Sequence, residues 1–453
     1  MTRNRLHENV FDKIKMGNPI MKCTSSSHAK SVRLLGLGVA TGTLMLGSLS
    51  AASAETLTIW GGYPEMAPFY EHVAEGMKDE YPDLDVNIET IALREHEKRV
   101  ALGLTSGGNG TMVIELAGST ATRYLENDLL PAAPEEMAEF VKDPANFGAF
   151  FSNTASYDGT VYGMPLFRGQ GALFYNTDMF AAAGLTEPPQ TMEDFTDYAV
   201  KLTERDASGK PEVSGWSLRL SGGGQGIAEK FWINLFQYGG SLLVETDDGM
   251  WKPDFANEAG RKALGQYLDN IYVEKTVTPE MPADADAFER GQTAMFIRES
   301  WVIGDIAAKA PDLNYATAPL PVGSIALPTN LYVSGDNQDL GWAFAKAANE
   351  PENLVWLLEN IGWLPNRSGI DYSSVTDQQP AFAAFVDYPE GYEFFTLPSI
   401  GPIEEILTRV AAQLVEAFGN PSLAGDDAAI DAVLAEASAE VEKILDREGL
   451  LAK

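Results

Sequence analysis

Strand and helix patterns alternate near the start of this chain, and this alternation constrains the fold more than any other feature. Residues 56–60 and 86–91 alternate polar and apolar side chains, as half-buried strands do. Apolar residues recur at helical spacing in 68–81 and 95–104, and a short apolar strand is expected at 112–116. Consecutive strands separated by helices form parallel crossovers, with helices on the faces of the sheet. The sequence therefore predicts an α/β fold.

Two short loops follow strands of this predicted sheet. Trp60, Gly62 and Tyr63 lie at the end of the first strand, and Ser119 and Thr120 follow the third. Ligands of open α/β sheets bind beyond the carboxyl ends of the strands, so we expect both loops to face a binding site. Further helices are expected at 191–203, which opens with a capping box of Thr191 and Asp194, and at 256–273, 337–349, 351–361, 404–418 and 426–448.

The first 54 residues differ in charge from the rest of the chain. They hold seven basic and two acidic residues, and 34–54 is uncharged and ends in Ala52-Ser53-Ala54. This arrangement is typical of a secretory signal peptide, with cleavage expected before Glu55. An uncleaved membrane anchor is the alternative, but the apolar stretch is short and rich in Gly, Ser and Thr. The start codon is left open between Met1, Met16 and Met21.

The mature chain of 399 residues has 63 acidic and 25 basic side chains, a net charge of −38. Such a charge argues against binding to nucleic acid or to an anionic membrane. The one cysteine, Cys23, precedes the apolar stretch, so no lipid-modified cysteine follows the cleavage site. We therefore expect a freely diffusing monomer in the periplasm, not a lipoprotein, without a disulfide scaffold or a multi-cysteine metal site.

Six segments of the mature chain occur in a recognisable order: 158–165, 173–191, 288–295 with Trp301, 315–323, 342–344 and 362–367. Together they resemble the extracellular solute-binding proteins of bacterial sugar ABC transporters, the maltose-binding-protein-like group. The resemblance implies a periplasmic-binding-protein type II fold, with two α/β lobes, hinge crossovers and a ligand cleft between the lobes. By analogy the chain crosses near 167–171, 329–334 and 368–372. The first lobe would hold 55–167 plus 333–368, and the second 171–330 plus 372–453.

The resemblance also implies a function. The chain would capture a carbohydrate, such as a mono- or oligosaccharide, a polyol or a sugar derivative, by hinge closure and deliver it to a transmembrane permease. It would need no cofactor and would not be an enzyme. An anionic sugar derivative is the alternative ligand, and a secreted glycoside-acting enzyme is the alternative of another class, since glycosidases need only two carboxylates. The two histidines of the mature chain, His72 and His96, are expected on surface helices without a hydrolase motif.

Sugar recognition uses flat aromatic faces and planar polar groups. The aromatic candidates are Trp60, Tyr63, Trp301 and Trp363; core packing is the competing interpretation for the tryptophans, and the resemblance implies stacking on sugar for Trp301. Ser119 and Thr120 stand where the maltose-binding group carries charged ligands of the sugar, which argues against a maltodextrin.

The polar candidates lie near the predicted crossovers. Arg168 and Gln170 are at the first and Arg367 is near the third, where an arginine would bind hydroxyls or an anionic group of the ligand, or would lie on the surface. Gly223 and Gly224 belong to a glycine-rich loop that either faces the ligand or is a plain turn. This loop lacks the lysine of a phosphate-binding P-loop.

Overall fold

The computed structural model describes residues 56–106, 110–221, 224–282 and 284–453. The predicted signal peptide and Cys23 lie outside the described residues, as does Gly223. Within the described part of the chain, no helix is long and apolar enough to cross a membrane.

A nine-stranded sheet organises the described residues. Along its main path the strands are hydrogen-bonded in the order β11 (Met295–Glu299), β6 (Gly163–Asn176), β13 (Gly323–Ser334), β3 (Thr111–Ala117), β1 (Thr56–Gly61) and β2 (Asp85–Thr90). Strand β1 pairs in parallel with both β2 and β3, which confirms the predicted parallel crossovers. Shorter strands extend it: β12 (Tyr315–Ala318) and β14 (Leu364–Pro365) pair with β6, and β15 (Glu393–Phe395) pairs with β13.

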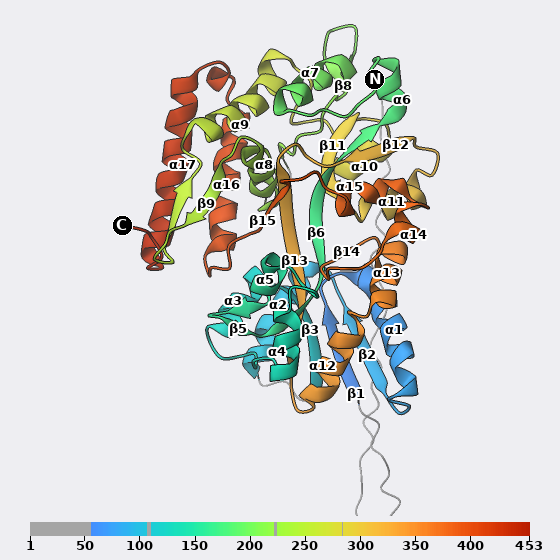
Figure 1. Cartoon of the computed structure of the whole chain (residues 1–453). Helices are drawn as coiled ribbons and strands as arrows, with labels where there is room; N and C mark the ends of the chain where they lie inside the picture. The colour runs from blue at the N-terminus through green and yellow to red at the C-terminus, as the bar shows by residue number, and fades with distance from the viewer. Residues whose placement is uncertain (1–55, 107–109, 222–223, 283) are drawn as a thin grey trace, which may run out of the picture. The chain divides into compact units, whose positions relative to one another are not determined.

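Two long strands, β6 and β13, connect the two halves of this sheet. Residues 163–170 of β6 pair with β13, whereas 171–176 pair with β11 and β12. Strand β13 pairs with β15 at 323–325 and with β3 at 329–334. Figure 1 shows β6 and β13 side by side, each continuing from one group of elements into the other. The exact limits of the two lobes stay a prediction.

In the first lobe, both faces of the sheet are covered. Val113 of β3 faces a core that includes Leu57 and Ile59, and the next residue, Ile114, faces the opposite core with Tyr124. This alternation follows from the two-residue period of a strand. The helices of this lobe are α1 (Ala67–Gly76), α2 (Leu93–Ser106), α3 (Gly118–Leu125), α4 (Glu135–Lys142), α5 (Ala149–Thr154), α12 (Gln338–Ala347) and α13 (Pro351–Asn360).

The second lobe has two cores. The larger one includes Phe231, Tyr267 and Phe418, and the smaller one lies around Phe174 and Phe296. In Figure 1 the helices α8, α9, α16 and α17 gather on one side of this lobe, and they contact one another. The helices are α6 (Thr177–Ala182), α7 (Met192–Leu202), α8 (Gly226–Gln237), α9 (Glu258–Leu268), α10 (Asp284–Glu289), α11 (Val302–Lys309), α14 (Ser373–Thr376), α15 (Ala383–Val386), α16 (Ile403–Phe418) and α17 (Asp427–Arg447).

Two predicted helices are divided in the structure. The helix expected at 68–81 corresponds to α1, which is preceded by a 3-10 turn at Pro64–Met66 and followed by another at Met77–Asp79. The helix expected at 256–273 begins as α9 and ends in a π-helical turn at Asp269–Val273. Apolar periodicity alone does not distinguish these tighter and wider turns from a continuous α-helix, because all of them keep one face toward the core.

Candidate functional site: a cleft beyond the ends of β1 and β3

A cleft opens beyond the carboxyl ends of β1 and β3. The space between its lining atoms is about 880 Å³, including open solvent at its mouth. On the side of α2, β3 and α3, polar or charged residues line it: Tyr63, Arg94, Glu97, Ser119, Thr120, Arg123 and Thr154. The facing side, formed by α8, β13, α16 and the segment before α16, contributes Gln225, Glu229, Thr329, Thr396, Ser399 and Glu404.

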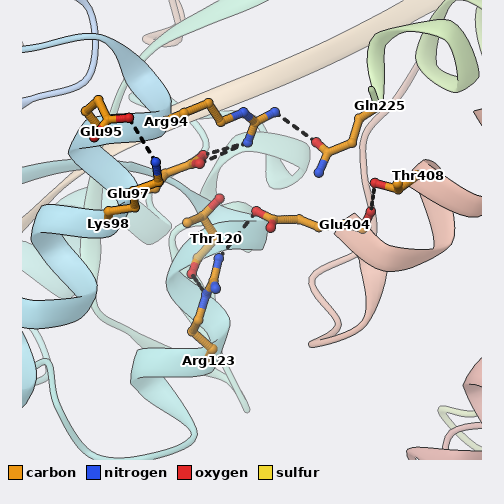
Figure 2. Close-up of polar contacts among 9 residues, drawn as sticks. All are labelled: Arg94, Glu95, Glu97, Lys98, Thr120, Arg123, Gln225, Glu404 and Thr408. Carbon is orange, nitrogen blue, oxygen red and sulfur yellow. Dashed lines mark hydrogen bonds and ion pairs between the residues drawn. The ribbon is translucent and has the colours of Figure 1, made fainter. Parts of the chain in front are cut away.

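Two arginines link the two sides of the cleft (Figure 2). The guanidinium of Arg94 donates to both carboxylate oxygens of Glu97, at 2.9 and 3.1 Å, and to Oε1 of Gln225 at 2.9 Å. The guanidinium of Arg123 lies 3.3 Å from a carboxylate oxygen of Glu404. Gln225 lies directly before α8, and Glu404 lies in the first turn of α16. Because both helices belong to the second lobe, each arginine bridges from the first lobe to the second.

The cleft offers both hydrogen-bond donors and acceptors. Helices α3 and α16 begin at its wall, and no side chain caps their first backbone N–H groups. Uncapped helix N-termini present N–H donors and a partial positive charge. Acceptors come from the carboxylates of Glu97, Glu229 and Glu404; burial and the nearby charge of Glu299 raise the pKa of Glu229.

Three sequence-predicted residues, Tyr63, Ser119 and Thr120, line the cleft together. The Tyr63 ring packs edge-on against Trp363, with centroids 5.1 Å apart, and against Phe167 at 5.4 Å. Trp363 itself is only 6% exposed, and its indole N–H donates to a carboxylate oxygen of Glu65 at 3.3 Å. Trp363 therefore supports the Tyr63 ring and does not itself line the cleft.

Trp60, Gly62 and Trp301 lie outside the cleft lining. The guanidinium of Arg99 covers the Trp60 ring at 4.8 Å, and that of Arg298 lies 5.2 Å from the Trp301 ring. The Gly62 N–H donates to the side chain of Glu115 at 2.8 Å, beneath the cleft wall.

The crossover residues Arg168, Gln170 and Arg367 also lie outside the lining. Arg168 donates to Gln170 at 2.9 Å, and to two backbone carbonyls and a tyrosine hydroxyl of the protein. Arg367 donates to the carbonyl of Asn349. Gly224 has a φ of 74° and lies next to the lining residue Gln225. A direct ligand contact stays a prediction for every site residue.

The expectation that His96 lies on the protein surface is wrong. Its side chain is completely buried, and Nε2 lies 2.7 Å from the carbonyl oxygen of Glu115. Helix α2 thus places a polar residue on its inner face, which the apolar period of the sequence could not reveal. Among the described residues, no group of three or more His, Cys, Asp and Glu side chains is arranged to hold a metal ion.

Residues 73–384 match the family described as bacterial extracellular solute-binding protein. The chain belongs to this family. A protein of Brucella abortus named as a binding protein is 22% identical over 432 residues, covering 92% of this chain and 98% of that one. A lactose-binding protein of Rhizobium radiobacter is 23% identical over 320 residues, 69% of this chain and 71% of the relative. Both agree with the family resemblance predicted from the ordered segments.

A solved structure supports the same fold. The sugar-binding protein MalE of Xanthomonas citri superposes with a TM-score of 0.71 at 21% identity, covering 87% of this solute-binding protein and 98% of that chain. The predicted type II architecture, two α/β lobes with a cleft between them, is therefore confirmed.

Sequence reasoning missed the charged residues of the cleft. Arg94 and Glu97 lie in the first turns of α2, directly after β2, and Arg123 lies in α3 after β3. The rule that ligands bind beyond strand ends would have found them had it been extended to the helices that follow. Glu229 and Glu404 had no comparable signal, because they come from α8 and α16 on the facing lobe.

Proposed function

We propose that this protein is the substrate-binding component of an ABC importer and that it captures a carbohydrate in the cleft between its lobes. The observation that carries the proposal is the cleft lining: one aromatic ring, Tyr63, among hydroxyl, amide, guanidinium and carboxylate groups from both lobes. A pyranose presents C–H faces to an aromatic ring and hydroxyls to planar polar groups. The sugar-binding names of the lactose-binding relative and of MalE support the same ligand class.

A neutral carbohydrate is favoured over an anionic derivative. Arg94 and Arg123, the arginines that line the cleft, already face Glu97 and Glu404. An anionic ligand would have to compete with these carboxylates, whereas a hydroxyl can share donors and acceptors with them. Arg168 and Arg367, which motivated the anionic alternative, direct their donors to atoms of the protein.

The mechanism follows from the two-sided lining. A ligand that touches groups of both lobes binds the closed form better than the open form, and so shifts the population toward closure. The permease would then recognise the closed protein. In keeping with the leader and the charge, the exported mature chain would act as a periplasmic monomer, without a lipid anchor, a cofactor, nucleic acid or catalytic turnover.

The test is a thermal-shift screen of the mature chain, residues 55–453, with maltose, lactose, maltotriose, tagatose and glucuronate as probes. A ligand present at 100 times its Kd stabilises the folded state by about 2.7 kcal/mol, which raises Tm measurably. We expect a neutral sugar to raise Tm in the unmodified protein and to lose this effect in Tyr63→Ala. The matched control is Tyr198→Ala, since Tyr198 is also half-buried but lies in α7, outside the cleft lining.

Three outcomes would contradict the proposal. They are no saturable shift with any probe, an equal loss of the shift in the control variant, and release of monosaccharide from an oligosaccharide probe by the purified protein. A shift with glucuronate alone would favour the anionic ligand instead.

A further inference from the structure

A buried carboxylate lies beneath the loop that carries Tyr63. Glu115 is 1% exposed and belongs to β3, where Val113 and Glu115 project to the same face of the sheet. Its Oε1 accepts the Gly62 N–H at 2.8 Å, and its Oε2 accepts the hydroxyl of Tyr70 from α1. Both donors are neutral. A carboxylate in a core without a directly bonded cation is costly, so its presence calls for a reason.

The backbone of Glu115 is fixed as firmly as its side chain. The Nε2 atom of His96 lies 2.7 Å from the Glu115 carbonyl, and Nδ1 lies 2.9 Å from a guanidinium nitrogen of Arg99. Because a guanidinium only donates, Nδ1 accepts, and the ring proton is on Nε2 and points at the Glu115 carbonyl. Burial and the charge of Arg99 lower the pKa of His96 to about 4, so this arrangement holds at neutral pH.

The same arginine holds the other side of the loop. Arg99 donates to the carbonyl of Glu89 at 2.9 Å and lies 3.5 Å from the carbonyl of Gly61. Side chains of α2 pack closely against Gly62: a Cβ there would lie 2.9 Å from Leu93 Cδ1 and 3.1 Å from His96 Cδ2. The loop is therefore held from below by Glu115 and from the side by α2, and the next residue, Tyr63, lines the cleft.

We propose that Glu115 is a positioning residue: its carboxylate holds the Gly61–Gly62–Tyr63 loop so that Tyr63 presents its ring to the cleft. The functional significance of placing Tyr63 in this way rests on the ligand-binding role proposed above, but the test of the placement itself needs no ligand. The carboxylate form suits the site because the groups directed at it donate, whereas a protonated carboxyl would need an acceptor. Protonation turns charge-assisted hydrogen bonds into neutral ones, with the Tyr70 hydroxyl accepting from the carboxyl, and so loosens the loop.

The charges around Glu115 set the pH at which this happens. Burial, and to a smaller extent the nearby charge of Glu65, raise its pKa, whereas hydrogen bonds from Tyr70, Gly62 and the Tyr63 backbone lower it; together they move the pKa from 4.5 to about 7. Of the other charged or titratable neighbours, Tyr63 and Tyr70 have raised pKa values and stay neutral, as does His96. Arg99 is cationic and pairs with Glu89. The loop is therefore held most firmly above pH 7 and loosens as the pH falls below it.

The stability of the whole protein runs the opposite way. A carboxyl whose pKa is higher in the folded than in the unfolded state contributes stability below pH 4.5 that is lost as the pH rises to about 7. Ionised Glu115 thus tightens the loop at the expense of global stability. For a residue that only stabilised the core, ionisation would not tighten a loop while lowering the stability of the whole protein.

The experiment follows the Gly62 amide by NMR in ligand-free protein labelled with 15N-glycine and carbonyl-13C-glycine. A signal that requires a labelled carbonyl before a labelled amide comes only from the five Gly-Gly pairs of the sequence, of which Gly61-Gly62 is one. We expect its proton shift to titrate with a midpoint near pH 7 in the unmodified protein, and not in Glu115→Gln. At pH 8 the amide of Glu115→Gln should exchange about fivefold faster, since a charge-assisted hydrogen bond becomes a neutral one. Its Tm at pH 8 should be no lower than that of the unmodified protein.

Two variants complete the design. Glu95→Gln is the matched control on α2, where the exposed Glu95 pairs with Lys98, and it should leave the titration unchanged. Tyr70→Phe removes a donor to the carboxylate, so its titration midpoint should move above 7; this variant also decides the matter should Glu115→Gln fail to fold. The proposal is overturned by a Gly62 amide that does not titrate, by a midpoint that Tyr70→Phe leaves in place, or by a Glu115→Gln protein with lower Tm and unchanged exchange.

Discussion

Arg168 has a role in the structure that its type and position did not reveal. It is 7% exposed, and its guanidinium lies 5.2 Å from the ring of Phe151 and 5.9 Å from that of Phe394. Its donors reach the carbonyls of Pro365 and Phe385. A guanidinium between two rings, bonded to carbonyls of distant segments, ties β6 to β14 and to the end of α15. The sequence predicted that Arg168 lies at a crossover, but it did not predict on which face of β6 its side chain lies.

We predict that Arg168→Ala destabilises the protein without the salt dependence of a surface charge. Removing a buried donor takes a hydrogen bond from each of its acceptors, at a cost of about 1–3 kcal/mol, and the lost ring contacts add to this. The measurement is urea unfolding at low and high salt. Arg290→Ala is the control, because Arg290 is exposed; its change should stay within about 0.5 kcal/mol. Equal effects of the two substitutions would refute the structural role.

At the scale of elements, sequence patterns were reliable where the interacting residues are neighbours in the sequence. The capping box of α7 is present as predicted: the N–H of Asp194 donates to the Thr191 hydroxyl at 3.1 Å, and the Asp194 carboxylate accepts the Thr191 N–H at 3.0 Å. Strand order was harder to predict, because β6 and β13 are far apart in sequence. They pair through backbone N–H and C=O groups, which carry no information about the partner strand. Only the family resemblance indicated that these segments form the crossovers.

The cap of α7 leads to a prediction of its own. Thr191→Ala should lower the free energy of unfolding by about 1 kcal/mol, since one N–H at the helix start loses its acceptor. Thr408→Ala is the control within α16, where the Thr408 hydroxyl donates to a carbonyl of its own helix and alanine is a better helix former. Chemical denaturation of both variants compares them. A cost for Thr408→Ala as large as for Thr191→Ala would show that the cap is not the cause.

At the scale of the whole molecule, polar contacts among the described residues join the lobes across the cleft. Arg94 reaches Gln225, and Arg123 reaches Glu404. The sequence predicted the cleft and three of its lining residues, because strand ends are local features. It could not predict these bridges, because each joins residues more than 100 positions apart whose spacing depends on how the lobes are placed.

We predict that the bridge between Arg123 and Glu404 makes the proposed closure of the lobes sensitive to charge. Both side chains are about half exposed, at 46% and 40%, so attraction across the cleft is screened by salt and is worth at most about 1 kcal/mol. Reversing one partner replaces attraction by repulsion. In ligand-free protein, Glu404→Arg should therefore shift the population toward open forms, seen as a larger radius of gyration by small-angle X-ray scattering at low salt.

The double exchange of charges is the decisive control for this bridge. Arg123→Glu combined with Glu404→Arg restores opposite charges across the cleft, so the radius of gyration should return toward that of the unmodified protein. High salt should reduce the difference between Glu404→Arg and the unmodified protein, because the ionic atmosphere screens exposed charges. A larger radius that persists in the double variant would mean that the substitutions disturb α16 itself. In that case the bridge would not govern the equilibrium between open and closed lobes.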